Sequence, residues 1–329
     1  MKIIAFVFLW AFSVAAYAQY EVSQLNDSDR LSAVAPCFVT ERGPHHRIWT
    51  RVGWETNKLG WVVARTNSYV ELATGMHYLE GGEWRESKEE IEILPHGAGA
   101  AAAKGQHKVI FPPDIYDGAI QMQLPDGQWL RSRVLGLSYF DEASGNSVLI
   151  TETTNSIGEL HGSNVVIYPD VFTDFRASLR LTYTKSGFEQ DIILLEQPPS
   201  CKEWGMDPAT TKLQVLTEFF DPPQPAKREL PVTDSKGNPA MDEVLDFPGD
   251  MQMGFGKAFS LMSGSSGEEI PVQKQWLKLE GRDFLVEQVE VSAIEKALEL
   301  LPRGASLSPG TNTVRLAYLG KPSLPARRQ

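Results

Sequence analysis

The chain has 329 residues, of which 42% are hydrophobic and 22% are charged, and its formal net charge is −11 at pH 7. This composition is that of a globular protein and excludes an intrinsically disordered chain. The acidic balance argues against a nucleic-acid partner, because binding to nucleic acid depends on lysine and arginine side chains that neutralise phosphates.

The N-terminus is typical of a signal peptide. A Met-Lys start is followed by an almost unbroken apolar run over residues 3–16, and Ala-Tyr-Ala at 16–18 is a small-x-small cleavage pattern. The run is too short to cross the roughly 30 Å hydrocarbon core of a bilayer. We therefore expect residues 1–18 to be removed on export. The rest would be extracellular, at the cell surface or in the periplasm, with no membrane span.

Residues 19–36 are polar and are expected to form an extended lead-in. From there to residue 301, apolar and polar residues alternate in short runs, the period of half-buried β-strands. The pair Gly81-Gly82 suits a two-residue hairpin loop, and Pro125-Asp126-Gly127 suits a tight turn. The pattern predicts a β-strand in each of the ranges 61–65, 69–74, 76–79, 120–124, 129–140, 148–154, 179–184, 188–195, 213–219, 270–279 and 284–291. Within the longest of them, one face would carry Leu135, Leu137 and Tyr139.

One helix is predicted, near the C-terminus. Ser292 can cap its first turn while Glu295 reaches back, which is a capping box, and Pro302 would end it. Its buried face would consist of three apolar residues at helical spacing, Ile294, Leu298 and Leu301.

The fold class expected from these elements is all-β: a large antiparallel β-sandwich over residues 37–301, with one short C-terminal helix and a Pro-rich excursion. The excursion is residues 221–249, which hold too many prolines for core strands. The loop at 198–212 can separate two sheets of one domain or two lobes, and we favour one domain. Residues 302–329 are expected to be a mobile tail with one short strand at 314–318.

Two cysteines, Cys37 and Cys201, can form a disulfide in an oxidising compartment. Such a bridge would close a very long loop and stabilise the fold by roughly 5 kcal/mol in the chain-entropy model. It would staple the N-terminal segment to the main body. The alternative is a pair of free, buried thiols.

His45 and His46 are the metal-ligand candidates, because imidazole is a common metal ligand. Adjacent residues of an extended chain point in opposite directions, and Arg42 and Arg47 would repel a cation. A structural or surface role is therefore favoured for the pair, with a general base as a further alternative. His107, just before an expected strand, is interpreted as hydrogen-bonded or exposed rather than catalytic.

No cofactor is expected. The run Gly97-Ala-Gly-Ala-Ala-Ala102 matches a loose dinucleotide fingerprint, but a nucleotide site needs a helix directly after the glycines, and the flanking sequence favours strands. We interpret this run as a flexible loop. The Gly264-Ser-Ser-Gly267 loop has the wrong spacing for a serine nucleophile elbow.

Carbohydrate chemistry has two sets of candidates. Asp141, Glu189 and Asp191 could supply the carboxylate pair of a glycoside hydrolase, although an acidic protein offers many such residues. Exposed tryptophans could stack on sugar rings, although tryptophans in strands are usually core residues. The available tryptophans are Trp61, Trp84, Trp129 and Trp276, of which Trp84 and Trp129 are the ligand-stacking candidates.

Several strings in the chain resemble one known group of proteins. The strings are Glu41–Trp49, Asn67–Tyr69, Gly105–Lys108, Leu135–Asp141, Gly187–Asp191 and Thr217–Phe219. They resemble the uncharacterised N-terminal region of large bacterial secreted proteins, some of which continue into RHS/YD-type repeats. The resemblance covers about residues 36–301 and implies an extracellular module, but no site residues. Without a repeat array, we expect a stand-alone or a truncated copy.

The function expected from the sequence is a non-catalytic extracellular structural or binding module, whose partner is a polysaccharide or a surface protein. One alternative is a carbohydrate-active enzyme that uses a carboxylate pair or a histidine in a sandwich cleft. Another is an assembly or secretion domain of surface proteins.

Overall fold

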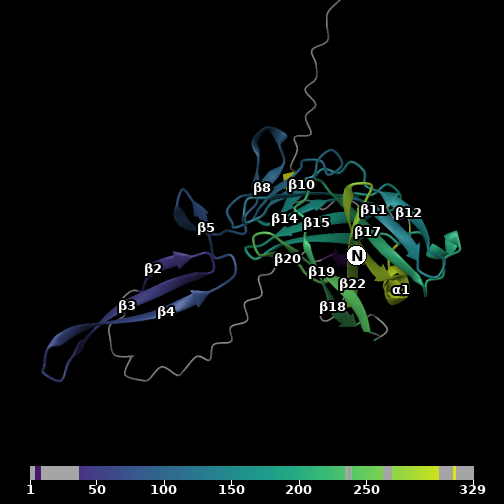
Figure 1. Cartoon of the computed structure of the whole chain (residues 1–329). Helices are drawn as coiled ribbons and strands as arrows, with labels where there is room; N and C mark the ends of the chain where they lie inside the picture. The colour runs from purple at the N-terminus through teal and green to yellow at the C-terminus, as the bar shows by residue number, and fades with distance from the viewer. Residues whose placement is uncertain are drawn as a thin grey trace, which may run out of the picture.

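The computed structural model describes residues 4–8, 37–233, 237, 239–261, 269–303 and 314–315. The expected lead-in, most of the expected leader and nearly all of the expected tail lie outside these residues. Most strands join one antiparallel sheet of 16 strands that folds over on itself (Figure 1). In hydrogen-bonding order they are β24 (Val314–Arg315), β13 (Glu159–His161), β14 (Val165–Tyr168), β15 (Ala177–Tyr183), β16 (Phe188–Leu194), β1 (Ile4–Phe8), β21 (Gly256–Ser260), β22 (Ile270–Leu279), β23 (Arg282–Glu290), β17 (Thr211–Phe219), β11 (Trp129–Asp141), β10 (Ile120–Gln123), β9 (Lys108–Phe111), β8 (Ala100–Ala102) and β7 (Glu92–Ile93), with β12 (Asn146–Glu152) also paired to β11.

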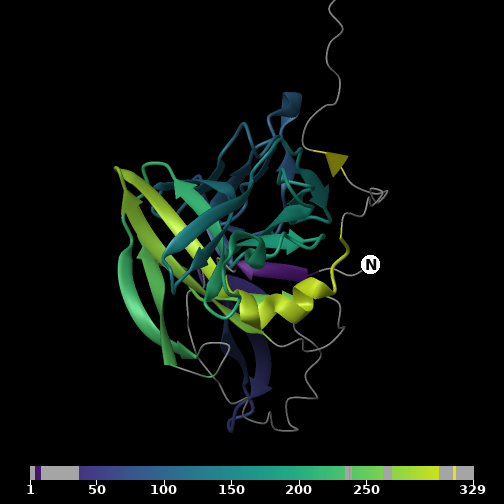
Figure 2. The same ribbon diagram turned by 90° about the vertical axis from the view of Figure 1, so that its right-hand side faces the viewer.

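The two halves of this sheet pack face to face around one hydrophobic core. Phe111 of β9 contacts Phe188 of β16 with ring centroids 6.2 Å apart, and the Tyr168 hydroxyl of β14 donates to the Pro112 carbonyl at 2.6 Å. One cluster of buried apolar residues includes members from both halves. Figure 2 shows green and yellow-green strands on the left and teal strands on the right. The predicted all-β sandwich is confirmed.

Each strand predicted from alternation falls on a strand of the structure. In β15, Leu179, Leu181 and Tyr183 are fully buried, as their spacing requires. The predicted hairpin joins β5 (His77–Glu80) to β6 (Glu83–Glu86). Its two glycines have φ of 59° and 84°, the left-handed conformation that a two-residue loop needs and that glycine adopts without a steric penalty.

The long strand β11 departs from strict alternation. Its register against β17 shifts between Val134 and Gly136, which is a β-bulge, so Val134, Leu137 and Tyr139 face the core. Leu135, predicted on the same face as Leu137, is only half-buried, so that prediction is wrong. A bulge adds one residue to the strand, so the side chains that follow it point to the opposite face from the one that strict alternation predicts.

The Pro-rich stretch, expected to be an excursion without core strands, is mostly β-strand. It forms β18 (Ala226–Thr233) and β19 (Pro239–Phe247), which join β20 (Met251–Met253), just after the stretch, in a second antiparallel sheet. Leu245 and Phe247 belong to the main core cluster, so this sheet packs on the body. Pro231 is tolerated because, among the described strands, β18 pairs only with β19 and is an edge strand.

The helix α1 (Val291–Glu299) lies along the lower edge of the body in Figure 2. It begins two residues earlier than predicted, with Glu290 rather than Ser292 at the N-cap position, and the N-cap side chain makes no capping hydrogen bond. The predicted capping box at Ser292 is therefore wrong, because that residue is already inside the helix. Val291, Ile294 and Leu298 form its buried face.

A long arm projects from the body (Figure 1). It is the three-stranded antiparallel sheet of β2 (Phe38–Gly43), β3 (His46–Thr56) and β4 (Val62–Leu72), and we call residues 38–72 the arm. Near the body, Glu71 accepts hydrogen bonds from Arg47 and from the Trp49 indole, both at 2.6 Å. In its outer half the described residues form β3 and β4 alone, so this part of the predicted sandwich range lies outside the sandwich.

Three further segments bear on the predictions. The 198–212 loop, which contains the 3-10 helix η3 (Cys201–Trp204), leads from β16 to β17, and residues on both sides of it belong to the same core cluster. The alanine run expected to be a flexible loop forms β8, in which Ala100 and Ala102 are buried. Strand β1 (Ile4–Phe8) lies within the predicted leader and pairs with β16 and β21.

Candidate ligand-binding cleft

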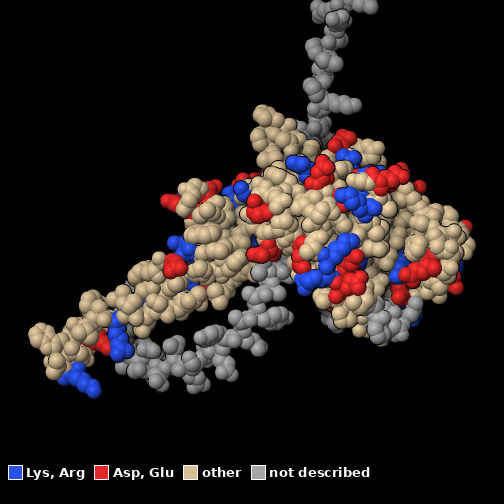
Figure 3. All heavy atoms as spheres, in the orientation of Figure 1, with Lys and Arg blue, Asp and Glu red and all other residues tan. Residues whose placement is uncertain are grey.

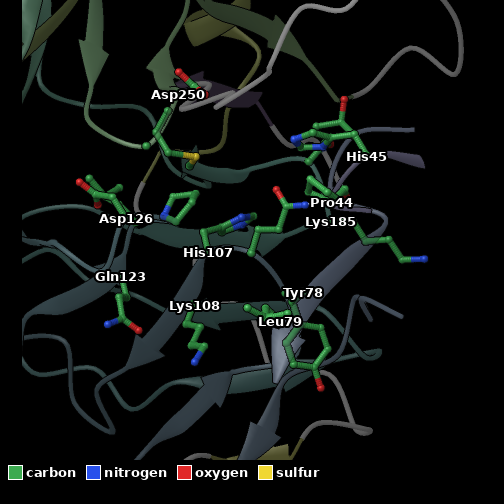
Figure 4. Close-up of a pocket in the computed structure, with 18 of the residues that line it drawn as sticks. Pro44, His45, Tyr78, Leu79, His107, Lys108, Gln123, Asp126, Lys185 and Asp250 are labelled. Carbon is green, nitrogen blue, oxygen red and sulfur yellow. Dashed lines mark hydrogen bonds between the residues drawn. The ribbon is translucent and has the colours of Figure 1, made fainter. Parts of the chain in front are cut away.

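The main candidate site is a cleft of about 540 Å³ where the arm meets the body. Its walls come from segments far apart in the sequence: the arm base, the β5–β6 hairpin, the start of β9, and the turns between β10 and β11, β15 and β16, and β19 and β20. Figure 4 shows side chains from these segments around one hollow.

His107 lies in the middle of this cleft (Figure 4). It is only 2% exposed, its ring packs on Tyr183 at 4.9 Å between centroids, and its Nε2 has no hydrogen-bond partner among the described residues. Burial lowers the pKa of His107 to about 4, while a backbone hydrogen bond at Gly187 acts in the opposite direction. The ring is therefore neutral at pH 7, and its Nε2 is buried beneath the cleft floor rather than exposed to the cleft.

One wall of the cleft is aromatic. Trp84 of β6, which is 37% exposed, and Tyr78 of β5 both line it. The Gln106 side-chain amide holds this hairpin in place, because it donates to the Pro44 carbonyl of the arm at 2.7 Å and to the His77 carbonyl of β5 at 3.0 Å. The aromatic wall is thus fixed to both the arm and the body.

The rim carries charges of both signs. Lys108 and Lys185 line the cleft together with Asp126 and Asp250. The two aspartates belong to turns that touch, since a Cβ built on Gly249 would meet the Asp126 backbone nitrogen at 3.0 Å. The cleft thus combines aromatic faces, which offer stacking surfaces, with amides and carboxylates, which offer hydrogen bonds.

The two candidate metal-binding histidines have separate partners. His45 Nδ1 accepts a hydrogen bond from the Gly75 amide at 3.1 Å, whereas His46 Nε2 lies 3.4 Å from a carboxylate oxygen of Glu41. The adjacent rings are therefore directed to different places. Among the residues that the structure describes, no group of three or more His, Cys, Asp or Glu side chains could hold a metal ion.

The expected disulfide is not formed. Cys37 is an exposed free thiol at the start of the arm, and Cys201 is a buried free thiol in η3. Burial raises the pKa of the Cys201 thiol, whereas a hydrogen bond with Thr211 and the charge of Lys202 act against this.

The structure does not bring the predicted carboxylates into the cleft. Asp141 closes the β11–β12 turn, where hydrogen bonds from Ser144 and Thr210 lower its pKa. Asp191 is fully buried on β16, and burial raises its pKa to about 6 although Arg180 binds it at 2.6 Å. Burial likewise raises the pKa of Glu189. These groups serve turn geometry and sheet packing.

The tryptophans divide between core, cleft and arm. Trp276 is a core residue, packed on Phe219 with centroids 4.8 Å apart. Trp84 lines the cleft as expected of a stacking residue, whereas Trp129, half-buried at the start of β11, does not. Sequence reasoning missed Tyr78 and Asp250, because nothing in their local patterns indicates that distant turns meet.

The arm offers a second surface. Its tip exposes large apolar side chains, with Trp54 70%, Leu59 81% and Trp61 69% exposed. Figure 3 shows that the arm carries few charged side chains on this face, while acidic and basic residues gather on the body. Exposed apolar patches of this kind mark interaction surfaces in soluble proteins.

Comparison with known proteins gives no relative: no family model, curated protein or solved structure matches the chain. In the described part of the chain, no helix combines the length and the apolar character that crossing a bilayer would need.

Proposed function

We propose that this protein is a non-catalytic extracellular binding module and that the cleft at the arm base binds a polysaccharide. The observation that carries the proposal is the joint presence of two aromatic side chains, Trp84 and Tyr78, and a rim of lysines and aspartates in one hollow. The signal-like leader supports the location, and the resemblance to the N-terminal region of bacterial secreted proteins supports a modular role.

The test is binding of the purified chain to a panel of neutral and acidic polysaccharides, measured by affinity electrophoresis and calorimetry. Trp84→Ala should weaken binding by at least about tenfold, since it removes a stacking surface. Trp129→Ala is the matched control, because this tryptophan lies outside the cleft, and it should leave affinity unchanged. Absence of binding across the panel, or equal losses in both variants, contradicts the proposal.

A catalytic role is the competing outcome of the same experiment. Asp126 and Asp250 both line the cleft, and a pair of carboxylates is what glycoside hydrolysis requires. If a bound polysaccharide is shortened, and Asp126→Asn or Asp250→Asn stops the release of reducing ends while binding persists, the protein is an enzyme and the non-catalytic proposal fails.

The exposed arm favours a second candidate function, which is assembly of surface proteins. A two-stranded ribbon with large apolar side chains on its surface is marginally stable alone and gains from a partner. Trp54→Ser combined with Trp61→Ser should release the protein from the cell surface into the medium. Leu279→Ser, at a large apolar residue of the body that is 56% exposed, should not. Equal retention of both variants rules out this role for the arm.

A further inference from the structure

The space between β16 and β21 is built to hold a strand. In the described part of the chain these two strands do not pair with each other, and each pairs with β1, from Ile4↔Leu194 to Phe8↔Gln190 on one side and from Ile4↔Ser260 to Val7↔Lys257 on the other. We call this space the acceptor slot. Strand β1 belongs to the predicted leader, so leader removal would take away the strand that joins β16 to β21.

An empty slot would be costly. The backbone N–H and C=O groups of two strand edges would lose their partners, and each such group is unfavourable when buried without a hydrogen bond. The slot also borders the core, because Ile192 and Leu194 of β16 and Ala258 of β21 are buried in the main apolar cluster. An extended segment with apolar residues opposite Ile192 and Leu194 would restore both the ladder and the core.

The slot also contains polar groups that β1 leaves unsatisfied. Both amide atoms of the Gln190 side chain and one carboxylate oxygen of Asp191 lack a hydrogen-bond partner among the described residues, although both residues are fully buried. Phe8 is in register with Gln190 and Val7 with Asp191, and neither residue type can form a side-chain hydrogen bond. The slot therefore has an apolar half at Ile192 and Leu194 and a polar end at Gln190 and Asp191.

We propose that, in the processed protein, the acceptor slot binds an extended strand from a second polypeptide. This strand carries apolar residues opposite Leu194 and Ile192, a hydrogen-bond donor opposite Asp191 and an amide opposite Gln190. The leader strand β1 holds the slot until it is removed. The proposal rests on the predicted leader and is independent of the polysaccharide cleft, so either can fail alone.

The test starts from the full chain with a specific protease site inserted between Ala18 and Gln19. After cleavage, residues 1–18 should stay bound to the body during gel filtration. They should then exchange with a fluorescent peptide of residues 2–10, extended by lysines for solubility, as measured by anisotropy. Phe6→Pro in this peptide should weaken binding by more than tenfold, because proline cannot complete the ladder.

Two substitutions, one in the peptide and one in the protein, then test whether peptide position 8 pairs with Gln190. Phe8→Gln in the peptide should strengthen binding to the cleaved protein about fivefold, through hydrogen bonds with Gln190. The protein variant Gln190→Leu should reverse this preference, which non-specific hydrophobic adhesion would not do.

Two results overturn the proposal. In one, the cleaved leader dissociates, the peptide does not bind, and the free energy of unfolding is unchanged. These results would mean that β16 and β21 pair directly with each other once the leader is gone. In the other, the peptide binds with the same affinity whether position 6 is Phe or Pro and whether position 190 is Gln or Leu.

Discussion

Lys274 Nζ and a carboxylate oxygen of Asp242 lie 2.8 Å apart, with side chains that are only 2% and 1% exposed. The Lys274 amide donates to the other carboxylate oxygen at 2.7 Å. Burial raises the pKa of Asp242, while its bonds with Lys274 act in the opposite direction. This ion pair attaches the Pro-rich sheet to β22 of the body.

Removing one partner of this pair leaves a buried charge alone, so Asp242→Ala or Lys274→Met should lower the free energy of unfolding by about 3–5 kcal/mol. The double variant should lose less than the sum of the two. Urea unfolding measures these values. The exposed pair Lys257–Glu269 is the control, and Glu269→Gln should cost less than about 1 kcal/mol. Equal costs at the two pairs would contradict the prediction.

Gly136, at the bulge of β11, should not tolerate a side chain. A Cβ at this position would lie 2.2 Å from the Thr151 carbonyl oxygen of β12, a backbone atom that cannot move without breaking the ladder. We expect Gly136→Ala to lower stability by about 1–3 kcal/mol through overpacking. Gly53→Ala on the arm is the control, because the nearest atom to its Cβ is 3.9 Å away, and thermal unfolding should barely change. Similar melting temperatures for both variants would refute the crowding argument.

His107 should make stability depend on pH. The pKa of His107 in the folded protein is about 4, below the ordinary value of 6.5. Its contribution to the free energy of unfolding is therefore complete above pH 6.5 and is lost as the pH falls toward 4. Asp191, with its pKa raised to about 6, gives a slope of opposite sign between pH 3.8 and 6. The measurement must therefore be a difference between variants.

We expect the stability gap between the wild type and His107→Gln, measured by urea unfolding, to shrink by about 2 kcal/mol from pH 7 to pH 5, because glutamine does not titrate. A gap that is the same at both pH values would show that His107 is not the titrating group.

The two thiols should differ in reactivity. Cys37 is exposed, while Cys201 is buried and its pKa is raised, so Cys37 should react with a thiol reagent within seconds and Cys201 only after unfolding. Cys37→Ser should abolish the fast phase alone. If no thiol is found in the denatured, unreduced protein, the disulfide expected from the sequence exists instead.

Local sequence patterns predict the local elements well. The alternation through Leu179, Leu181 and Tyr183 gives a buried strand face, and Gly81-Gly82 gives the hairpin loop. The bulge at Leu135 could not be predicted, because it depends on how β17 pairs with β11 rather than on the residue itself. The prolines around β18 wrongly argued against strands for the same reason. Only the sheet order shows that β18 is an edge strand, in which proline is tolerated.

The cleft lies beyond local patterns altogether. Of its residues, Trp84 was a candidate from residue type alone, and it does line the cleft. Asp250 and Lys185 belong to turns that resemble any surface turn, and their proximity follows from the tertiary fold.

The ladder between β11 and β17 joins residues far apart in the chain, as in the pair Ser138↔Gln214. Folds with such distant contacts form slowly, on the millisecond-to-second scale, because a long loop must close before any bond compensates for the lost entropy. During synthesis, β11 cannot complete its pairing with β17 until residue 219 has left the ribosome. Until then its apolar side chains remain open to aggregation or to a chaperone.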